Sequence, residues 1–563
     1  MSIKNTILKY SLQNAIRYNG KANVNAIIGK VLSENPKLRS KIKEITKEIQ
    51  TIVKDVNSIS VDEQTKKLKK IAPELLEEKK IKEKKELPPL EGVKKGKVVI
   101  RFEPSPSGPL HVGHAYVLSL NSEYCRIYNG KLILRIADTN PERIYKPSYE
   151  LIEKDANWVT KNNVAKVVIQ SDRLEIYYKY AEELIKKGYA YVCKCKPEDF
   201  REKMMKSMAC PCRNLTKETN LDRWKGMLSN YKEGEAVLRI KTDLKNKNPA
   251  MRDWPALRIK EAEHPKQRKK YRVWPLLNFA VAIDDHELKI SHTIRAKEHM
   301  DNEKKQKYIF DYLNWKVPTH LYIGRINFKD LRVSCSKTRP LIESGKYIGW
   351  DDIRLPFLEA LKRRGYQPDA FIKYAIDVGV SPNDKTVSAS EFFKVINAFN
   401  KEIIDPKSNR YFFIEDPVKI KIENAPKQNI ELDLHPDNKK GGRKFKASDE
   451  FFICKNDFKN IKNNKLIRLM DCLNFIKKDK RFIFDSLEYG KYKEAGDMII
   501  HWLPINSPIN VSVLMPDSVI KKGIGESLLK KLKVNNIIQF ERVGFCRLDK
   551  IEKDKLVFWF THK

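Results

Sequence analysis

The chain has 563 residues, with 111 Lys and Arg against 73 Asp and Glu, so its formal net charge is +38. At roughly 100 to 200 residues per domain, this length predicts three to five domains. The positive charge favours a polyanionic partner such as nucleic acid, although Lys-rich composition can also reflect nucleotide bias or adaptation to heat. The sequence lacks any run of about 18 uncharged apolar residues, which excludes a transmembrane helix, and we expect no membrane partner.

The beginning of the chain and the cysteine content indicate a reducing compartment. The first twenty residues carry Lys, Asn and Gln throughout and lack the apolar core of a secretory signal, so we expect a cytoplasmic protein. Nine cysteines are too few for a disulfide framework in a chain of this length. Four of them lie close together in sequence, which indicates a metal site.

Residues 1–76 are predicted to be helical, because apolar residues recur there at spacings of three and four among Lys and Glu. This stripe comprises Ile42, Ile45, Ile49, Ile52, Val53 and Val56. Residues 77–96 contain blocks of charge followed by Pro88 and Pro89, which predicts a solvated linker.

The following segment predicts a parallel α/β sheet. Val98 to Ile100 and Leu132 to Leu134 are short apolar runs, as expected for strands covered by helices on both faces. A helix beginning near His111 separates them, and such sheets bind ligands beyond the carboxyl ends of their strands. A Cys-bearing insertion is expected at residues 190–265.

The remaining chain changes from helical to strand-like periodicity. Trp274 to Asp311 and Trp350 to Val380 are predicted to be mostly helical. After about residue 405, strand-like runs follow, of which the first two alternate strictly. They are Val418 to Ile422, Ile430 to Leu434 and Leu556 to Phe560. The C-terminal third is therefore predicted to form one or two β-barrels.

The most informative string is RFEPSPSGPLHVGHA, which spans Arg101 to Ala115. A predicted strand ends in it, a Pro/Gly turn follows, and His111 to His114 lies where a helix begins. Helix N-termini bind phosphate through free amides and the helix dipole. Gly113 lets a nucleotide lie against the backbone, and the two imidazoles can donate hydrogen bonds to phosphate oxygens. The alternative is an ordinary helix start with incidental histidines.

This string resembles the HIGH motif of class I aminoacyl-tRNA synthetases, in the form of the glutamyl and glutaminyl enzymes. A second string, Val333 to Lys337 (VSCSK), resembles the KMSKS loop, whose lysine stabilises the pyrophosphate leaving group in the family. It lies between the strand-like His320 to Gly324 and the tract Gly349 to Pro356, which is also typical of the family.

The resemblance extends over nearly the whole chain. The opening KYSLQNAIRYNGKANVNAIIGKVL is similar to the N-terminal region of archaeal glutamyl-tRNA synthetases. Asn409 to Pro417, His501 to Pro504 and Phe540 to Asp549 resemble the anticodon-binding barrels of glutaminyl and archaeal-type glutamyl enzymes. The resemblance thus implies a multidomain α/β plus β protein, with a helical N-terminal region, a Rossmann-like catalytic domain, a zinc-bearing acceptor-stem insertion, a helical connector and anticodon-binding β-barrels.

The implied domains are the helical region, the linker, the two catalytic halves, the insertion between them, the KMSKS-like loop with the connector, and the barrels. The helical region covers residues 1–76 and the linker 77–96. The catalytic halves cover 97–190 and 271–318, with the insertion at 191–270 between them. The KMSKS-like loop and the connector cover 319–404, and the barrels cover 405–563.

The resemblance also implies the site residues for ATP, which would bind with Mg²⁺. The expected catalytic residues are His111, His114 and Lys337. The expected ATP-binding residues are Pro104, Ser105, Pro106, Gly108, His111, Gly113, His114, Ser336 and Lys337.

The cysteine cluster has the pattern CxC, fourteen residues, CxC. Its members are Cys193, Cys195, Cys210 and Cys212. Four thiolates suit a closed tetrahedral Zn²⁺ site, whereas the alternatives are four unrelated thiols or a labile disulfide. The resemblance supports structural zinc, since archaeal-type enzymes carry a zinc knuckle in this insertion, often with His at the position of Cys212. The other cysteines are interpreted as structural: Cys125, Cys335, Cys454, Cys472 and Cys546.

A pocket for glutamate needs a cation for the side-chain carboxylate. Arg101 and Arg295 match two arginines of the family, and Arg295 favours glutamate because glutaminyl enzymes lack it. The alternative for Arg295 is a surface arginine near the acceptor stem. Asp138 also matches the family motif, and we expect it to belong to the amino-acid site.

Three positions depart from the family pattern. Ala137 replaces an acidic residue that contacts the substrate ammonium, Leu277 replaces a tyrosine, and Val281 stands where a polar residue is frequent. Glu103 stands where relatives carry a small or apolar residue, and we consider it as a surrogate ammonium ligand. The alternatives are that Glu103 pairs with a nearby arginine, or that the enzyme is impaired.

The resemblance therefore predicts an archaeal-type glutamyl-tRNA synthetase that is monomeric and binds ATP, L-glutamate and tRNA(Glu). Whether tRNA(Gln) is a second acceptor stays open. A glutaminyl-tRNA synthetase and a catalytically weakened tRNA-binding or assembly protein remain as rival interpretations. A generic HxGH nucleotidylyltransferase is a more distant rival, because it would not explain the barrels.

Overall fold

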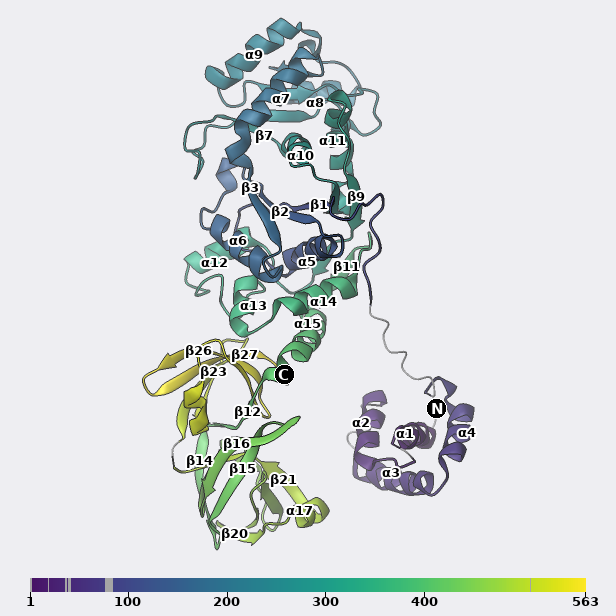
Figure 1. Cartoon of the computed structure of the whole chain (residues 1–563), viewed down its shortest axis with the longest axis vertical. Helices are drawn as coiled ribbons and strands as arrows, with labels where there is room; N and C mark the ends of the chain where they lie inside the picture. Colours follow the sequence, from purple (N-terminus) through teal and green to yellow (C-terminus); the bar gives the residue numbers. More distant parts are fainter. Residues whose placement is uncertain (1–2, 19, 36–37, 39–41, 76–84, 507) are drawn as a thin grey trace. The chain divides into compact units, whose positions relative to one another are not determined.

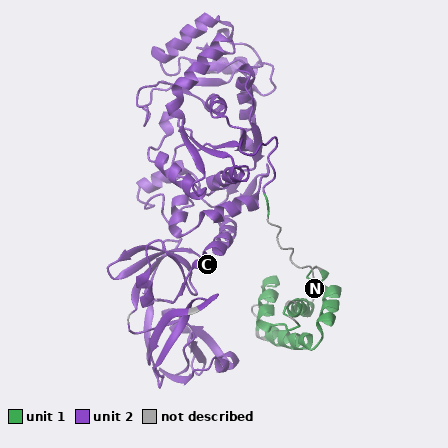
Figure 2. Cartoon of the chain, viewed as in Figure 1, with its two compact units in different colours: residues 1–86 green, residues 87–563 purple. Residues whose placement is uncertain are grey.

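The computed structural model describes residues 3–18, 20–35, 38, 42–75, 85–506 and 508–563. The chain divides into two compact units, Met1–Glu86 and Leu87–Lys563, which Figure 2 colours separately. Part of the predicted linker, residues 76–84, lies outside the described residues. Within the described ranges, no helix combines the length and the apolar character needed to span a bilayer.

The first unit is helical, as predicted. Its described helices are α1 (Ile3–Arg17), α2 (Val24–Glu34), α3 (Ile42–Asn57) and α4 (Val61–Ile71). The predicted apolar stripe of α3 faces the core of this unit, except that Ile42 at the helix start is 43% exposed. The buried Gln64 amide donates hydrogen bonds to carbonyls of Gly20, Val56 and Ile59, which fixes α4 against the end of α3 and the neighbouring loops.

The second unit begins with the predicted parallel sheet, whose strands run in the order β3-β2-β1-β8-β9. The described strands are β1 (Val99–Phe102), β2 (Lys131–Ile136), β3 (Val164–Ile169), β8 (His292–Ala296) and β9 (Thr319–Ile323). Helices α5 (Val112–Ile127) and α6 (Ser148–Val159) pack on it (Figure 1). The chain leaves β1 towards β2 on one side and adds β8 on the other, so β1 lies at a switch point where ligands bind.

An antiparallel sheet with its own core is inserted between β3 and β8. It contains β4 (Ala190–Cys193), β5 (Val237–Ile240), β6 (Pro255–Ile259) and β7 (Val273–Pro275), in that order. The accompanying helices are α7 (Leu174–Lys186), α8 (Pro197–Met205), α9 (Lys217–Ser229), α10 (Leu277–Glu287) and α11 (Met300–Tyr312). Trp274 to Asp311 is mostly helical, as predicted, but the central strand β8 interrupts the two helices at His292–Ala296.

The predicted helical connector follows β9. It comprises β10 (Ile326–Phe328), α12 (Cys335–Glu343), α13 (Leu358–Arg364), α14 (Pro368–Val378), β11 (Lys385–Val387) and α15 (Ala389–Ile404). Arg363 on α13 pairs with Asp549 at 2.9 and 2.7 Å, and Arg364 donates to the carbonyl oxygen of Thr561 at 2.9 Å. These bonds attach the connector to the C-terminal sheets.

The C-terminal third forms two barrel-like sheets, which confirms the predicted β structure (Figure 1). One sheet contains β12 (Arg410–Tyr411), β13 (Phe413–Glu415), β23 (Ile509–Leu514), β24 (Ile520–Gly525), β25 (Ile537–Phe540), β26 (Gly544–Glu552) and β27 (Lys555–His562). The other contains β14 (Pro417–Glu423), β17 (Glu450–Cys454), β18 (Leu466–Leu469), β19 (Asn474–Lys478), β20 (Arg481–Ser486), β21 (Gly496–Ile500) and β22 (Trp502–Pro504). The hairpin of β15 (Gln428–His435) and β16 (Asn438–Ala447) and the short helices α16 (Lys455–Asn460) and α17 (Tyr489–Ala495) complete this region.

Candidate active site

The HxGH string caps α5, as predicted. His111 is the N-cap residue, and its Nδ1 accepts a hydrogen bond from the Gly113 amide at 3.1 Å. Nδ1 of His114 accepts from the His111 amide at 3.4 Å, and the two rings stack with centroids 3.7 Å apart. Because both Nδ1 atoms act as acceptors, each neutral ring carries its hydrogen on Nε2.

Burial lowers the pKa of both imidazoles. The pKa of His111 lies well below its usual value, through burial and the neighbouring His114, and that of His114 falls to about 4. Both rings are therefore neutral near pH 7. Each remains a donor through Nε2–H, which suits a phosphate oxygen on which charge develops.

The KMSKS-like string begins α12 and lies against the loop that precedes the HxGH string. The Cys335 Sγ lies 3.5 Å from the Pro109 carbonyl oxygen. Only glycine fits at position 108, because a Cβ there would lie 2.7 Å from the Cys335 sulfur. Ser336 and Lys337 are exposed on the first turn of α12. The fold thus brings together two signatures that are far apart in sequence.

A cavity of about 440 Å³ opens beyond the carboxyl ends of β1 and β8. It unites seven of the predicted site residues: Arg101, Glu103, Pro104, Ser105, His114, Leu277 and Arg295. The other predicted ATP residues, including His111 and Lys337, lie outside its lining. The three positions that depart from the family pattern, Ala137, Leu277 and Val281, make part of its wall apolar.

Asp285 of α10 lies between three guanidinium groups at this cavity. Its Oδ1 accepts from Arg101 Nε at 3.0 Å and from Arg135 at 2.8 Å, and its Oδ2 lies 3.7 Å from Arg295. Burial alone would raise the pKa of Asp285, but Arg101, Arg135 and Arg295 together lower it to about 2. Asp285 is therefore ionised and orients the arginines.

Arg295 of β8 is 6% exposed, so it is not the surface arginine of the alternative interpretation. Its Nε donates to Thr293 Oγ1 at 3.1 Å and one terminal nitrogen donates to Gln306 at 3.0 Å. The other terminal nitrogen is buried and has no hydrogen-bond acceptor among the described residues. Burial and the nearby Arg101 lower the pKa of Arg295 to about 10. An anion in the cavity would complete its bonding.

Glu103 and Asp138 occupy different environments. Glu103 lines the cavity, and its Oε2 accepts from Arg135 at 2.8 Å and lies 3.5 Å from Arg101, so it pairs with nearby arginines as one alternative predicted. Asp138 is fully buried and accepts from Ser171 and Tyr149 at 2.7 Å. Asp138 does not line the cavity, and its carboxylate instead fixes the turn after β2.

Three buried charged residues near the cavity, Arg135, Asp284 and Asp285, were not among the residues predicted from the sequence. Arg135 is fully buried in β2, and Asp284 accepts from Arg173 and Tyr177, both at 2.7 Å. The sequence does contain a signal for them, which is a lone arginine in an apolar strand and two adjacent aspartates in an apolar helix. Because buried charges are paired, such residues predict an ion pair between the strand and the helix.

The four predicted cysteines converge in the insertion, and none of them is in a disulfide. The Cys193 and Cys210 sulfurs lie 3.9 Å apart, and those of Cys195 and Cys212 lie 3.8 Å apart. Tetrahedral zinc with Zn–S bonds of about 2.3 Å has sulfur–sulfur edges of roughly 3.8 Å. Three donors, Cys193, Cys195 and Cys210, lie within 4.8 Å of one another and are compatible with Zn²⁺, whereas the Cys212 sulfur approaches this group through Cys195.

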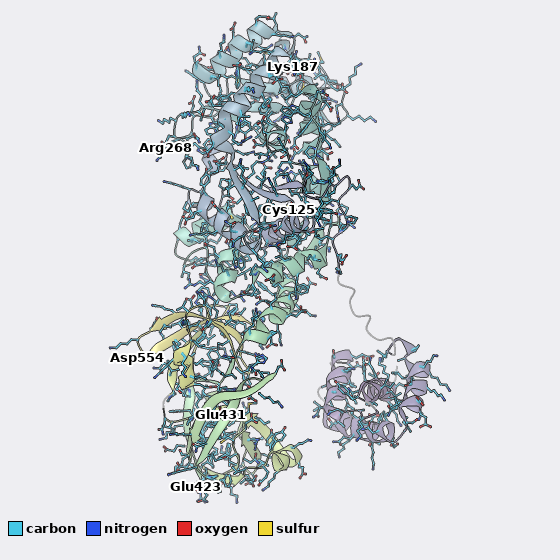
Figure 3. The ribbon with its side chains drawn as sticks, in the orientation of Figure 1. Cys125, Lys187, Arg268, Glu423, Glu431 and Asp554 are labelled. Carbon is cyan, nitrogen blue, oxygen red and sulfur yellow. The ribbon has the colours of Figure 1, made fainter. Side chains whose placement is uncertain are left out.

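Neighbouring donors stabilise the thiolate form of Cys212. The Lys194 amide and Arg223 donate to the Cys212 sulfur at 3.5 and 3.2 Å. Burial opposes ionisation of Cys212, but these donors lower its pKa overall. The remaining cysteines lie outside the cluster; Cys125, for example, is buried on α5 (Figure 3).

The comparisons with known proteins agree with this geometry. The family described as tRNA synthetases class I (E and Q), catalytic domain, matches residues 97–406. Models of the anti-codon binding domain of the same family match residues 408–485 and 499–549. The chain therefore belongs to the E and Q group of class I tRNA synthetases.

Several full-length proteins that are similar to the chain carry the name glutamate–tRNA ligase. The glutamate–tRNA ligase of Pyrococcus abyssi (strain GE5 / Orsay) is 46% identical to it, with 100% of each chain covered. Those of Methanobrevibacter smithii and Methanocaldococcus jannaschii are 42% and 41% identical, with 100% and 99% of each chain covered.

Proposed function

We propose that the protein is a glutamate–tRNA ligase, which activates L-glutamate with ATP and transfers it to tRNA(Glu). The observation that carries the choice of amino acid is the buried Arg295, with one unsatisfied donor nitrogen beside the second guanidinium of Arg101. A carboxylate satisfies such donors and offsets their charge, whereas the amide of glutamine does neither fully. The names of the full-length relatives support the same substrate.

The proposed amino-acid site comprises Arg101, Arg295 and the half-exposed Leu277, with Asp138 holding the adjacent turn. The proposed ATP site is formed by the loop after β1 and by the two signatures. Its members are Pro104, Ser105, Pro106, Gly108, His111, Gly113, His114, Ser336 and Lys337. The Nε2–H groups of the histidines donate to phosphate oxygens, and the exposed ammonium of Lys337 stabilises the leaving pyrophosphate.

In the proposed reaction an oxygen of the glutamate α-carboxylate attacks the α-phosphorus of ATP. The bond to the bridging oxygen breaks, and pyrophosphate leaves with that oxygen, so glutamyl-adenylate forms. A terminal adenosine hydroxyl of tRNA then attacks the acyl carbon, loses its proton and releases AMP. Bound Mg²⁺ neutralises phosphate charge in such transfers. The protein mainly positions the reactants and stabilises charge.

The proposed partner is a single tRNA that contacts both the Cys-bearing insertion and the C-terminal sheets. The charge of +38 supports binding to a polyanion, with affinity that falls steeply with salt. Zinc held by Cys193, Cys195, Cys210 and Cys212 would fix the two turns of the insertion. We propose that the protein is a cytoplasmic monomer. Whether it also transfers glutamate to tRNA(Gln) is to be tested.

The test is aminoacylation of tRNA(Glu) and tRNA(Gln) transcripts with labelled glutamate or glutamine. The Lys337→Ala variant is the blank, and Lys346→Ala, at an exposed lysine outside the signature, is the matched control. Glutamate on tRNA(Glu) is the expected product, and glutamate on tRNA(Gln) would add the second acceptor. Transfer of glutamine alone would identify a glutaminyl enzyme. Binding of tRNA without transfer of either amino acid would contradict the proposal and favour a weakened relative.

A further inference from the structure

We infer that Glu103 binds the α-ammonium group of the amino-acid substrate; this inference rests on the proposed function. Glu103 is the only carboxylate among the described residues that line the cavity. The lining also carries two guanidinium groups, Arg101 and Arg295, and its other members are uncharged. Its two histidines, His114 and His299, are neutral near pH 7 because burial lowers the pKa of each.

This set of charges is the complement of glutamate. The substrate carries two carboxylates and one ammonium group, and the cavity offers two cations and one anion. An ammonium group that leaves water needs an anionic or carbonyl acceptor, since burying an unpaired charge is costly. Ala137 and Val281, on the same wall, have no side-chain acceptor to offer.

The Glu103 carboxylate retains bonding capacity. Oε2 is held by Arg135 at 2.8 Å, whereas Oε1 accepts from the Gln170 amide at the long distance of 3.4 Å. An ionised carboxylate has about four lone-pair sites, so Oε1 can accept from an ammonium group. The side chain is 10% exposed, which limits competition from water.

The same arginine links Glu103 to the cationic part of the site. Arg135 donates to Glu103 and, at 2.8 Å, to Asp285, which in turn accepts from Arg101 at 3.0 Å. The fully buried Arg135 therefore sets the spacing between the proposed ammonium ligand and a proposed carboxylate ligand. Arg135 is a positioning residue in this arrangement, and Glu103 is a binding residue.

Position 137 offers a direct test by relocation of the charge. The Ala137 amide donates to the Pro104 carbonyl at 3.0 Å, so the segments that follow β1 and β2 lie side by side. Ala137 lines the same cavity as Glu103. A glutamate at position 137 can therefore supply a carboxylate to this cavity from the neighbouring segment.

The experiment is glutamate-dependent ATP–pyrophosphate exchange by the full chain in the presence of tRNA(Glu). For Glu103→Gln we expect the KM for glutamate to rise about 10- to 100-fold, as for loss of a hydrogen bond between charged groups. The KM for ATP should change less than about twofold. The double variant Glu103→Ala/Ala137→Glu should recover most of the loss. Glu153→Gln, at an exposed position of α6, is the matched control.

Glutarate, which is glutamate without the amino group, separates binding from positioning. If Glu103 binds the ammonium, Glu103→Gln should leave the inhibition constant of glutarate unchanged or lower it. If Glu103 only holds Arg135, glutamate and glutarate should weaken in parallel and Ala137→Glu should restore nothing, and either result would overturn the inference. Absence of glutamate-dependent exchange in the unmodified protein would instead count against the proposed function itself.

Discussion

Replacement of Asp285 by Asn tests whether this buried carboxylate holds the arginines of the site. The change preserves shape but removes the negative charge that Arg101, Arg135 and Arg295 share at 3.0, 2.8 and 3.7 Å. Removing one partner from a buried charge network costs about 3–5 kcal/mol. The fall in the pKa of Asp285 from 3.8 to about 2 corresponds to roughly 2 kcal/mol. The value from the pKa shift is smaller because it measures only the cost of protonating Asp285. It does not include the cost of leaving the arginines without a charged partner.

The assay is urea unfolding of the full chain, followed by tryptophan fluorescence at pH 7. Six of the eight tryptophans lie between residues 158 and 350, so the signal reports mainly on the region around the site. With a urea dependence of about 3 kcal/mol per M, a loss of about 3 kcal/mol lowers the midpoint by roughly 1 M. The KM for glutamate should rise as well, because Arg101 and Arg295 lose a shared anchor.

The control is Asp369→Asn, which removes an exposed pair with Lys161 and should cost about 0–1 kcal/mol. The lowered pKa of Asp285 contributes stability that is present above about pH 4 and is lost as pH falls towards 2. The difference between Asp285→Asn and the unmodified chain should therefore persist from pH 5 to 8. A midpoint shift no larger than that of the control would refute the proposed role of Asp285.

Four further predictions address the rest of the site. Lys337→Ala should lower the kcat of ATP–pyrophosphate exchange about 100-fold or more, since it removes charge stabilisation of the leaving group. Arg295→Gln should raise the KM for glutamate about 100-fold, because a charged hydrogen-bond donor is lost. Cys195→Ala should abolish the binding of one zinc per chain, measured by elemental analysis, and lower tRNA charging about tenfold while exchange persists. Burial lowers the pKa of His114 to about 4, so between pH 6.5 and 4 the unfolded chain binds a proton at this residue that the folded chain does not bind. The free energy of unfolding should therefore decrease as the pH falls from 6.5 to 4. His114→Gln should make the urea midpoint depend less on pH over this range.

Matched variants outside the site distinguish these effects from general damage. Lys346→Ala and Arg325→Gln alter exposed residues and should leave exchange within about twofold. Cys454→Ala alters a cysteine outside the cluster and should retain zinc. Full zinc retention by Cys195→Ala, or equal slopes with pH for His114→Gln and the unmodified chain, would contradict the corresponding prediction.

The class of protein and much of the fold could be predicted from local patterns. The apolar runs at Val98 and Leu132 predicted β1 and β2 because strands covered on both faces need continuous apolar residues. The string ending at His114 predicted a helix start, and His111 does cap α5. The CxC pairs predicted the convergence of sulfurs that the structure shows. These signals are local because they depend on spacing along a few turns of chain.

The tertiary structure decided which distant residues share the cavity. Residue 101 and residue 285 are far apart in sequence, and only the packing of α10 against the sheet places Asp285 among Arg101, Arg135 and Arg295. Sequence periodicity also failed at β8, because a five-residue strand between two helices is too short to interrupt a helical pattern clearly. The orientation of Glu103 towards Arg135, and its place in the cavity, depend on the alignment of two parallel strands. Pairing of charges across a sheet depends on contacts between segments that are distant in sequence, so the tertiary structure decides it. The motifs proposed to bind phosphate each lie within one short segment, so the sequence alone is enough to predict them.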